Sequence, residues 1–115
     1  MKALQNKILA FFVFIFMSLP AGAVTGWTGF RSISDFGCHN TDGTCYLTID
    51  GDEVSGGSNC TSRSIRWDSR NDPNGKTWLA LLLTAKSLGT KVGFYVGSCY
   101  AMQPVYPTFY WGALE

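Results

Sequence analysis

Residues 24–115 consist mainly of short segments in which apolar and polar residues alternate, as they do in half-buried β-strands. The clearest alternation covers residues 45–49 and stops at the turn signal Asp50-Gly51. Pro104 and Pro107 confine the last segment to a sheet edge, because proline cannot donate a ladder hydrogen bond. The pattern predicts five strands, at residues 27–33, 45–49, 60–67, 91–97 and 105–111.

Two further expectations follow from the same pattern. In the third strand, Ile65 and Trp67 should face inward, whereas Ser64, Arg66 and Asp68 should face outward. Residues 36–43, between the first two strands, form a turn-rich segment that ends in the hairpin signal Asp42-Gly43.

One segment, residues 75–88, has helical periodicity, and Gly89 is suited to end that helix in the left-handed conformation. The apolar stripe expected to cover a sheet consists of Trp78, Leu81, Leu82, Ala85 and Leu88. Leu79 and Leu83 lie outside this stripe and one turn apart. Two such leucines favour contact with another subunit, so we expect a homo-oligomer.

The predicted order is three strands, one helix and two strands. This order is typical of an all-β, OB-like five-stranded barrel, in which the helix lies between strands 3 and 4 and closes one end. Other small α+β sheets have the same order of elements. We expect the OB-like barrel as the architecture of residues 24–115.

The first 23 residues have the composition of a secretory signal peptide. Two lysines precede an apolar run over residues 8–19, and small residues lead to an expected cleavage site after Ala23. Residues 24–115 are then a single domain, and we expect it to be secreted or periplasmic. No second apolar run approaches the roughly 20 residues that cross a bilayer, which predicts no membrane span in this domain.

Four cysteines, Cys38, Cys45, Cys60 and Cys99, follow the signal peptide. A small exported domain commonly uses disulfides to supplement a small core. Three pairings are open to four cysteines, and we favour Cys38–Cys45 as a local disulfide with Cys60–Cys99 as a long-range one. The chain contains one histidine and no Cys-x-x-Cys pair, which argues against a zinc site.

The charges do not indicate a nucleic-acid partner. Without the two lysines of the signal peptide, the domain contains seven basic and eight acidic residues. A nucleic-acid-binding surface is normally basic. Arg63, Arg66 and Arg70 are close in sequence, but Asp68 and Asp72 interrupt them. We interpret this cluster as a solvated edge of mixed charge.

Catalytic chemistry has little support in the sequence. His39, the sole histidine, lies in a predicted turn, so no nucleophile and base are paired by the pattern. Asp50, Asp52 and Glu53 lack the spacing of a twelve-residue calcium loop and are expected to be solvated turn residues. The prediction is a non-enzymatic protein that needs no cofactor or metal ion.

Three short stretches resemble the binding subunits of subtilase-cytotoxin type, the B subunits of AB5 toxins. They are Trp27-Thr28-Gly29, residues 45–51 and Cys60-Thr61-Ser62. The resemblance implies an oligosaccharide-binding barrel, a ring of five copies, a toxin A subunit as partner and recognition of sialylated glycans. It also implies that Ser32, Ser34 and Asp35 hold the carboxylate and hydroxyl groups of the sugar.

Aromatic residues are concentrated in the last third of the domain, where they can stack on the apolar faces of sugars. Alternation predicts that Phe94, Val96, Phe109 and Trp111 face inward, whereas Tyr95 and Tyr110 face outward as possible stacking rings. We therefore expect a secreted binding module for a glycan or glycoprotein. The alternative is a secreted or periplasmic protein-interaction or inhibitor domain whose aromatic edge contacts a protein.

Overall fold

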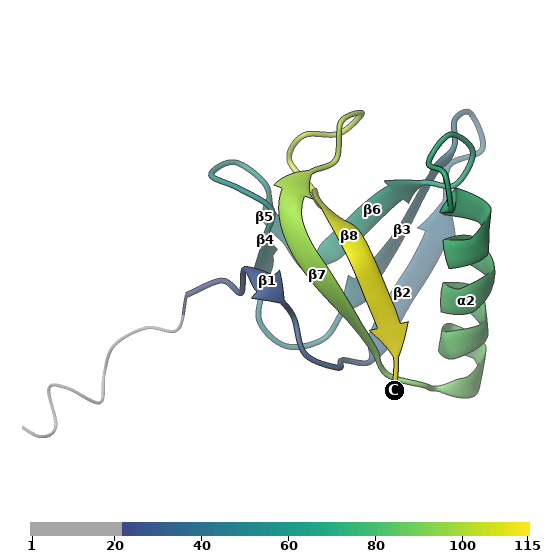
Figure 1. The fold of residues 1–115 in the computed structure, drawn as a ribbon, viewed down its shortest axis with the longest axis horizontal. Helices are drawn as coiled ribbons and strands as arrows, with labels where there is room; N and C mark the ends of the chain where they lie inside the picture. Colours follow the sequence, from purple (N-terminus) through teal and green to yellow (C-terminus); the bar gives the residue numbers. More distant parts are fainter. Residues whose placement is uncertain (1–21) are drawn as a thin grey trace, which may run out of the picture.

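A computed structural model describes residues 22–115, which form a strand-rich globule with one helix (Figure 1). The predicted signal peptide lies outside the described residues except for Gly22 and Ala23. Within residues 22–115, the elements in chain order are β1 (Gly26–Trp27), β2 (Ile33–Cys38), β3 (Thr44–Ile49), β4 (Val54–Ser55), β5 (Thr61–Ser62), β6 (Ser64–Asp68), α2 (Gly75–Leu88), β7 (Val92–Cys99) and β8 (Pro107–Leu114).

The strands form two three-stranded antiparallel sheets and one small strand pair. The sheets have the orders β1-β7-β8 and β2-β3-β6, and β4 pairs with β5. β6 contacts β8, but no hydrogen-bonded ladder within residues 22–115 joins the two sheets. The prediction of a closed five-stranded barrel is therefore wrong, because the sheets remain open.

The first predicted strand, residues 27–33, explains part of this difference. Gly29 has φ +76°, a conformation that other residues rarely adopt, and it turns the chain directly after β1. Arg31 makes a single bridge to Val92 of β7, and the chain then enters β2 at Ile33. A continuous strand was expected here, but its two ends belong to different sheets.

The turn predicted after residue 36 begins later than expected. β2 extends to Cys38 and pairs with β3, in which Cys45 is the register partner of Cys38. The hairpin closes when the amide of His39 donates to the carbonyl of Thr44 at 2.8 Å. A hairpin near Asp42-Gly43 is confirmed, whereas the non-strand assignment of Phe36 and Gly37 is wrong.

The core lies between the two sheets and α2. Its largest fully buried side chains include Trp67, Phe94, Leu47, Ile49, Ile65 and Leu82. The inward predictions for Ile65, Trp67, Phe94 and Val96 are confirmed. Both favoured disulfides are also confirmed: Cys38–Cys45 lies inside the β2–β3 hairpin, and Cys60–Cys99 connects the start of β5 to the end of β7.

The helix has the predicted bounds, and Gly89 follows it with φ +70° as expected. Its buried stripe differs, because Leu82 and Ala85 are buried and Leu79 packs against the core, while Leu81 and Leu88 are exposed. A Cβ at Gly75 would overlap the carbonyl oxygen of Asp68. The first turn of the helix therefore lies directly against the end of β6.

Residues 22–115 contain no helix that is long and apolar enough to span a membrane.

Candidate functional site

The serine and acidic residues predicted to bind sugar lie on or beside β2. Ile33 pairs with Ile49, but Asp35 pairs with Thr48, so the register shifts at Ser34. The shift leaves Ser34 and Asp35 as consecutive exposed residues. Ser34 is already engaged, because its hydroxyl donates to the carbonyl of Thr48 at 3.2 Å.

Ser32 is exposed, and its amide donates to the Asp50 carboxylate at 2.9 Å. Asp35 alone of the three predicted residues lines a surface pocket of about 370 Å³. We call this cavity the Arg66 pocket, and its lining includes Asp35, Tyr46, Arg63, Ser64, Arg66 and Tyr106. The structure thus does not bring Ser32, Ser34 and Asp35 together as one site.

Strand alternation places the floor of the Arg66 pocket on the outer face of β2-β3-β6. Tyr46 of β3 is the register partner of Arg66 of β6, and Thr48 is the partner of Ser64. The residues between them, Leu47 and Ile65, are fully buried. The same alternation that builds the core therefore points the polar residues of both strands outward.

Arg66 is the central group of this pocket. Its guanidinium lies 3.5 Å from the ring centroid of Tyr106 and 5.0 Å from that of Tyr46. Cation–π contacts of this kind hold a guanidinium in place, and one of its Nη atoms also donates to Gln103. The Arg66 Nε and Ser64 Oγ atoms are buried and have no hydrogen-bond partner among residues 22–115.

The pocket combines both signs of charge with hydroxyl groups. Arg63 and Arg66 supply donors, Asp35 and Glu53 supply acceptors, and Ser62 lies with them in the lining. An arginine fork matches a carboxylate in geometry and charge, while serines and carboxylates pair with hydroxyls. The pocket is thus suited to bind a polyhydroxy molecule that carries an anionic group.

The arginine cluster was interpreted from the sequence as a solvated edge of mixed charge, and Arg66 is less exposed than that interpretation implies. Its side chain is half-buried between two tyrosines. Arg70 is exposed and lies elsewhere, with its amide donating to Asp68 at 2.9 Å. Alternation identified Arg66 as outward-facing, but Tyr106 comes from the loop before β8, and no sequence pattern connected that loop to β6.

A second exposed feature lies on the outer face of β1-β7-β8. We call it the aromatic platform, and it consists of Trp27, Tyr95, Tyr110 and Trp111. Tyr95 and Tyr110 were predicted to face outward, and their exposed fractions of 41% and 62% confirm this. Trp111 was expected inside but is 50% exposed.

A register shift is the reason for the wrong prediction at Trp111. Tyr95 pairs with Trp111, whereas Val96 pairs with Phe109, so Tyr110 is an extra residue in β8. Such a β-bulge resets the alternation of side chains. Phe109 consequently packs against the core as predicted, while Tyr110 and Trp111 both face solvent.

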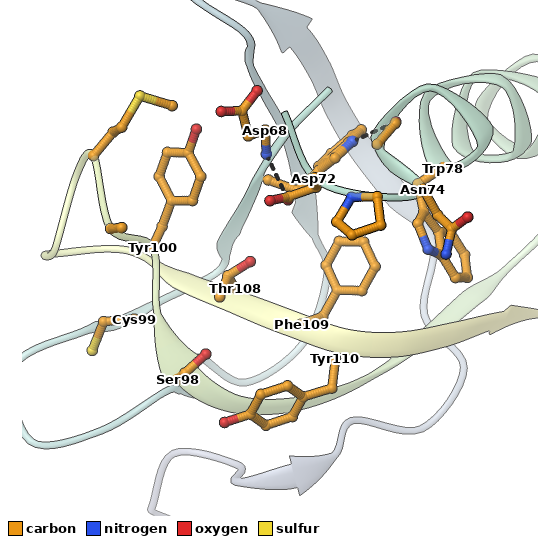
Figure 2. Close-up of a pocket in the computed structure, with 15 residues that line it drawn as sticks. Asp68, Asp72, Asn74, Trp78, Ser98, Cys99, Tyr100, Thr108, Phe109 and Tyr110 are labelled. Carbon is orange, nitrogen blue, oxygen red and sulfur yellow. Dashed lines mark hydrogen bonds between the residues drawn. The ribbon is translucent and has the colours of Figure 1, made fainter. Parts of the chain in front are cut away.

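A groove of about 520 Å³ lies between the start of α2, the end of β7 and the start of β8 (Figure 2). Five of its fifteen lining residues are aromatic, and Trp78 is edge-on to Phe109 at 5.2 Å between centroids. Its polar groups serve the fold: the Tyr100 hydroxyl pairs with Thr44 at 2.7 Å, and Asp72 accepts the Asp68 amide at 3.0 Å.

Asp68, predicted to face outward, is buried in the lining of this groove. Burial raises the pKa of its carboxyl, but hydrogen bonds from Asn71 and from the Arg70 amide outweigh that effect, so the net pKa is lowered. The carboxylate therefore holds the loop after β6. It is satisfied internally, in contrast to the donors of the Arg66 pocket.

The sole histidine lies apart from these features. His39 Nδ1 lies 3.1 Å from the Asp42 carboxylate in the β2–β3 turn, on an exposed part of the hairpin. The four cysteines are all in disulfides, which leaves no thiolate in residues 22–115 to act as a nucleophile or zinc ligand.

Comparison of the chain with protein-family models, with curated protein sequences and with solved structures yields no match. The resemblance to toxin B subunits therefore stays a prediction from three short stretches of sequence. The Arg66 pocket and the aromatic platform are the features of residues 22–115 that are suited to binding.

Proposed function

We propose that this protein is a secreted, non-enzymatic module that recognises glycans through the Arg66 pocket. The observation that supports the proposal is the position of Arg66, whose guanidinium packs against two tyrosine rings, while its buried Nε atom and the buried Ser64 hydroxyl have no hydrogen-bond partner among residues 22–115. Buried polar groups normally have partners. Two unpaired groups in one pocket are therefore consistent with a ligand that supplies them.

The chemistry of the lining favours a sugar that carries a carboxylate. Arg66 and Arg63 offer donors to the carboxylate, while Asp35 and Ser62 offer partners to sugar hydroxyls. This combination agrees with the sialylated ligands that the family resemblance implies. Asp35 keeps the role expected of it, whereas Ser32 and Ser34 lie outside the lining of the pocket.

A secreted or periplasmic location is part of the proposal. Two disulfides join all the cysteines of residues 22–115, and disulfides persist mainly in oxidising compartments. The predicted signal peptide supplies a route to such a compartment.

The resemblance extends the proposal to a toxin-type B subunit with an OB-like order of elements, which assembles as a ring of five and carries an A subunit. The exposed leucines of α2 support self-assembly, since Leu81, Leu83 and Leu88 are 41%, 50% and 75% exposed. Leu79, which was expected to join Leu83 in that contact, instead packs against the core. The assembly surface proposed on α2 is therefore Leu81, Leu83 and Leu88.

A protein-interaction or inhibitor domain is the second candidate. The exposed rings of the aromatic platform favour it, because tryptophan and tyrosine are enriched at the centres of protein interfaces. In that case the partner would contact β1-β7-β8, and the Arg66 pocket would stay empty. The two candidates thus differ in which sheet face binds.

A glycan array tests the proposal. Sialylated glycans are expected to retain the wild-type protein, and the neutral counterparts without sialic acid are expected to retain it less. Arg66→Ala should abolish the preference, while Arg70→Ala, which removes the same charge from an exposed site outside the pocket, should keep it. Equal signals from sialylated and neutral glycans, or equal loss in both variants, would contradict the proposal.

A further inference from the structure

The rings of the aromatic platform form one row across three strands. Trp27 of β1 pairs in register with Tyr95 of β7, which pairs with Trp111 of β8. The Trp111 ring is nearly parallel to both: its centroid lies 5.2 Å from Trp27 at 18° and 5.7 Å from Tyr95 at 13°. Tyr110 lies 6.3 Å from Tyr95. Mutual contact thus holds the rings in a fixed arrangement.

Glycines on β7 let the outer rings lie close to the backbone. A Cβ at Gly93 would overlap the Trp27 ring, and a Cβ at Gly97 would approach Tyr110 Cε2 to 2.8 Å. The Tyr110 hydroxyl also donates to the Gly97 carbonyl at 3.3 Å. A row of rings anchored over glycines presents a pre-organised surface, which costs little conformational entropy on binding.

The platform is open and uncharged. Its four rings are 38% to 62% exposed, and none of its residues carries a charge. Phe30, 43% exposed, extends it at the edge of Trp27. Adjacent exposed rings mark a binding surface, and the lack of charge favours a neutral ligand. This contrasts with the arginines and carboxylates of the Arg66 pocket.

The area of the platform matches a small ligand better than a complete protein interface. An aromatic side chain offers roughly 150–250 Å², so four half-exposed rings provide about 400 Å². A stable protein interface needs about 800 Å² from each partner. Membrane-surface helices add lysines and arginines to their aromatic residues, and the platform has none. A ligand of a few sugar rings matches the available area.

We infer that the aromatic platform is a second binding site, which takes neutral pyranose oligosaccharides by stacking the apolar faces of their rings on Tyr110, the most exposed ring, beside the stacked Trp111. The inference adds a ligand class to the proposed function, but it does not depend on the Arg66 pocket. The two sites lie on different sheets and select by different chemistry. A protein that fails to bind sialylated glycans can still bind neutral ones here.

Tryptophan fluorescence tests the inference, because Trp27 and Trp111 are exposed and respond to a stacked sugar. The probes are maltohexaose, cellohexaose and chitohexaose, titrated into the full disulfide-bonded protein. At least one of them is expected to change the emission and saturate. Tyr110→Ala and Trp111→Ala should each weaken that binding about tenfold or more. Leu88→Ala, at an exposed apolar position on α2, is the control and should leave it unchanged.

Near-ultraviolet circular dichroism identifies any variant that fails to fold. If Trp111→Ala does not fold, Tyr110→Ala, which changes the most exposed ring, still tests the inference. Loss of neutral-sugar binding in Arg66→Ala would place the site in the pocket and overturn the inference. No saturation with any of the three probes would also overturn it. A dimer that dissociates in Tyr110→Ala, seen by light scattering, would show a second copy of the chain as the occupant.

Discussion

The outer faces of the two sheets differ in chemistry, although their inner faces share one core. On β2-β3-β6 the outward residues include Tyr46, Ser64 and Arg66, and they form a polar pocket with fixed charge. On β1-β7-β8 they include Tyr95 and Trp111, which form an uncharged row of rings. Strand alternation thus determines which residues form the core, while the outward positions can carry different side chains on the two sheets.

The largest predicted effect concerns the disulfide that connects the strand pair β4-β5 to the sheet β1-β7-β8. Cys60–Cys99 links the start of β5 to the end of β7 across 39 residues, whereas Cys38–Cys45 closes 7 residues within one sheet. Loop-closure entropy then predicts that Cys60→Ala/Cys99→Ala lowers the free energy of unfolding by about 4 kcal/mol. The corresponding loss for Cys38→Ala/Cys45→Ala is about 2 kcal/mol.

Urea denaturation of both double variants measures these two losses. The order of the losses is the critical result. If removing Cys38–Cys45 costs as much as removing Cys60–Cys99 or more, the long-range disulfide does not stabilise the arrangement of the sheets as described.

Asp68 shows how the groove differs from the Arg66 pocket. Its carboxylate has hydrogen-bond partners, whereas the Arg66 Nε atom has none among residues 22–115. Asp68→Asn removes a charged acceptor from Asn71 and the Arg70 amide, and we expect it to lower the free energy of unfolding at neutral pH by about 1–3 kcal/mol. Since the pKa of Asp68 is lowered, its contribution is complete above pH 4 and is lost as pH falls through the folded-state pKa. Unfolding curves at pH 7 and pH 3 should therefore show a smaller gap between wild type and variant at pH 3. A gap that grows on acidification would contradict the lowered pKa.

Salt should distinguish the two outer faces. Raising the salt concentration from 50 to 500 mM is expected to weaken sialylated-glycan binding several-fold, because the ions screen the attraction between the ligand carboxylate and Arg66. Binding of a neutral oligosaccharide to the aromatic platform should change little. Calorimetric titrations at both salt concentrations measure this difference, and equal salt dependence for the two ligands would show that they share one site.

The smallest predicted effect concerns α2. Leu83→Ser replaces a half-exposed side chain, so the free energy of unfolding should change by no more than about 0.5 kcal/mol. If the exposed leucines form the assembly surface, the same variant should reduce the molar mass measured by light scattering. A wild-type protein that is monomeric at high concentration would refute the assembly proposal. Leu79→Ser is the control, and it should mainly destabilise the fold because Leu79 packs against the core.

The sequence predicted those parts of the fold that depend on local patterns. The bounds of α2, its glycine end, the β3 strand and both favoured disulfides are confirmed. The errors lie where tertiary geometry overrides periodicity. Gly29 divides one expected strand between two sheets, and the bulge at Tyr110 exposes Trp111.

The candidate site was less predictable for the same reason. Asp35 was identified, and alternation placed Arg66 on the outside, but the Arg66 pocket also requires Tyr106 from a loop far along the chain. The register shift at Ser34 leaves Ser34 and Asp35 as consecutive exposed residues, of which only Asp35 lines the pocket. Neither long-range proximity nor a bulge leaves a periodic signal in the sequence.

The central claim is that the Arg66 pocket holds an acidic sugar, and a nuclear magnetic resonance titration of ¹⁵N-labelled protein tests it most directly. With 3′-sialyllactose, the amide shifts of Tyr46, Ser64 and Arg66 should move and saturate, while lactose at the same concentrations should move them much less. Unchanged shifts at these three residues, or equal changes with both sugars, would contradict the claim.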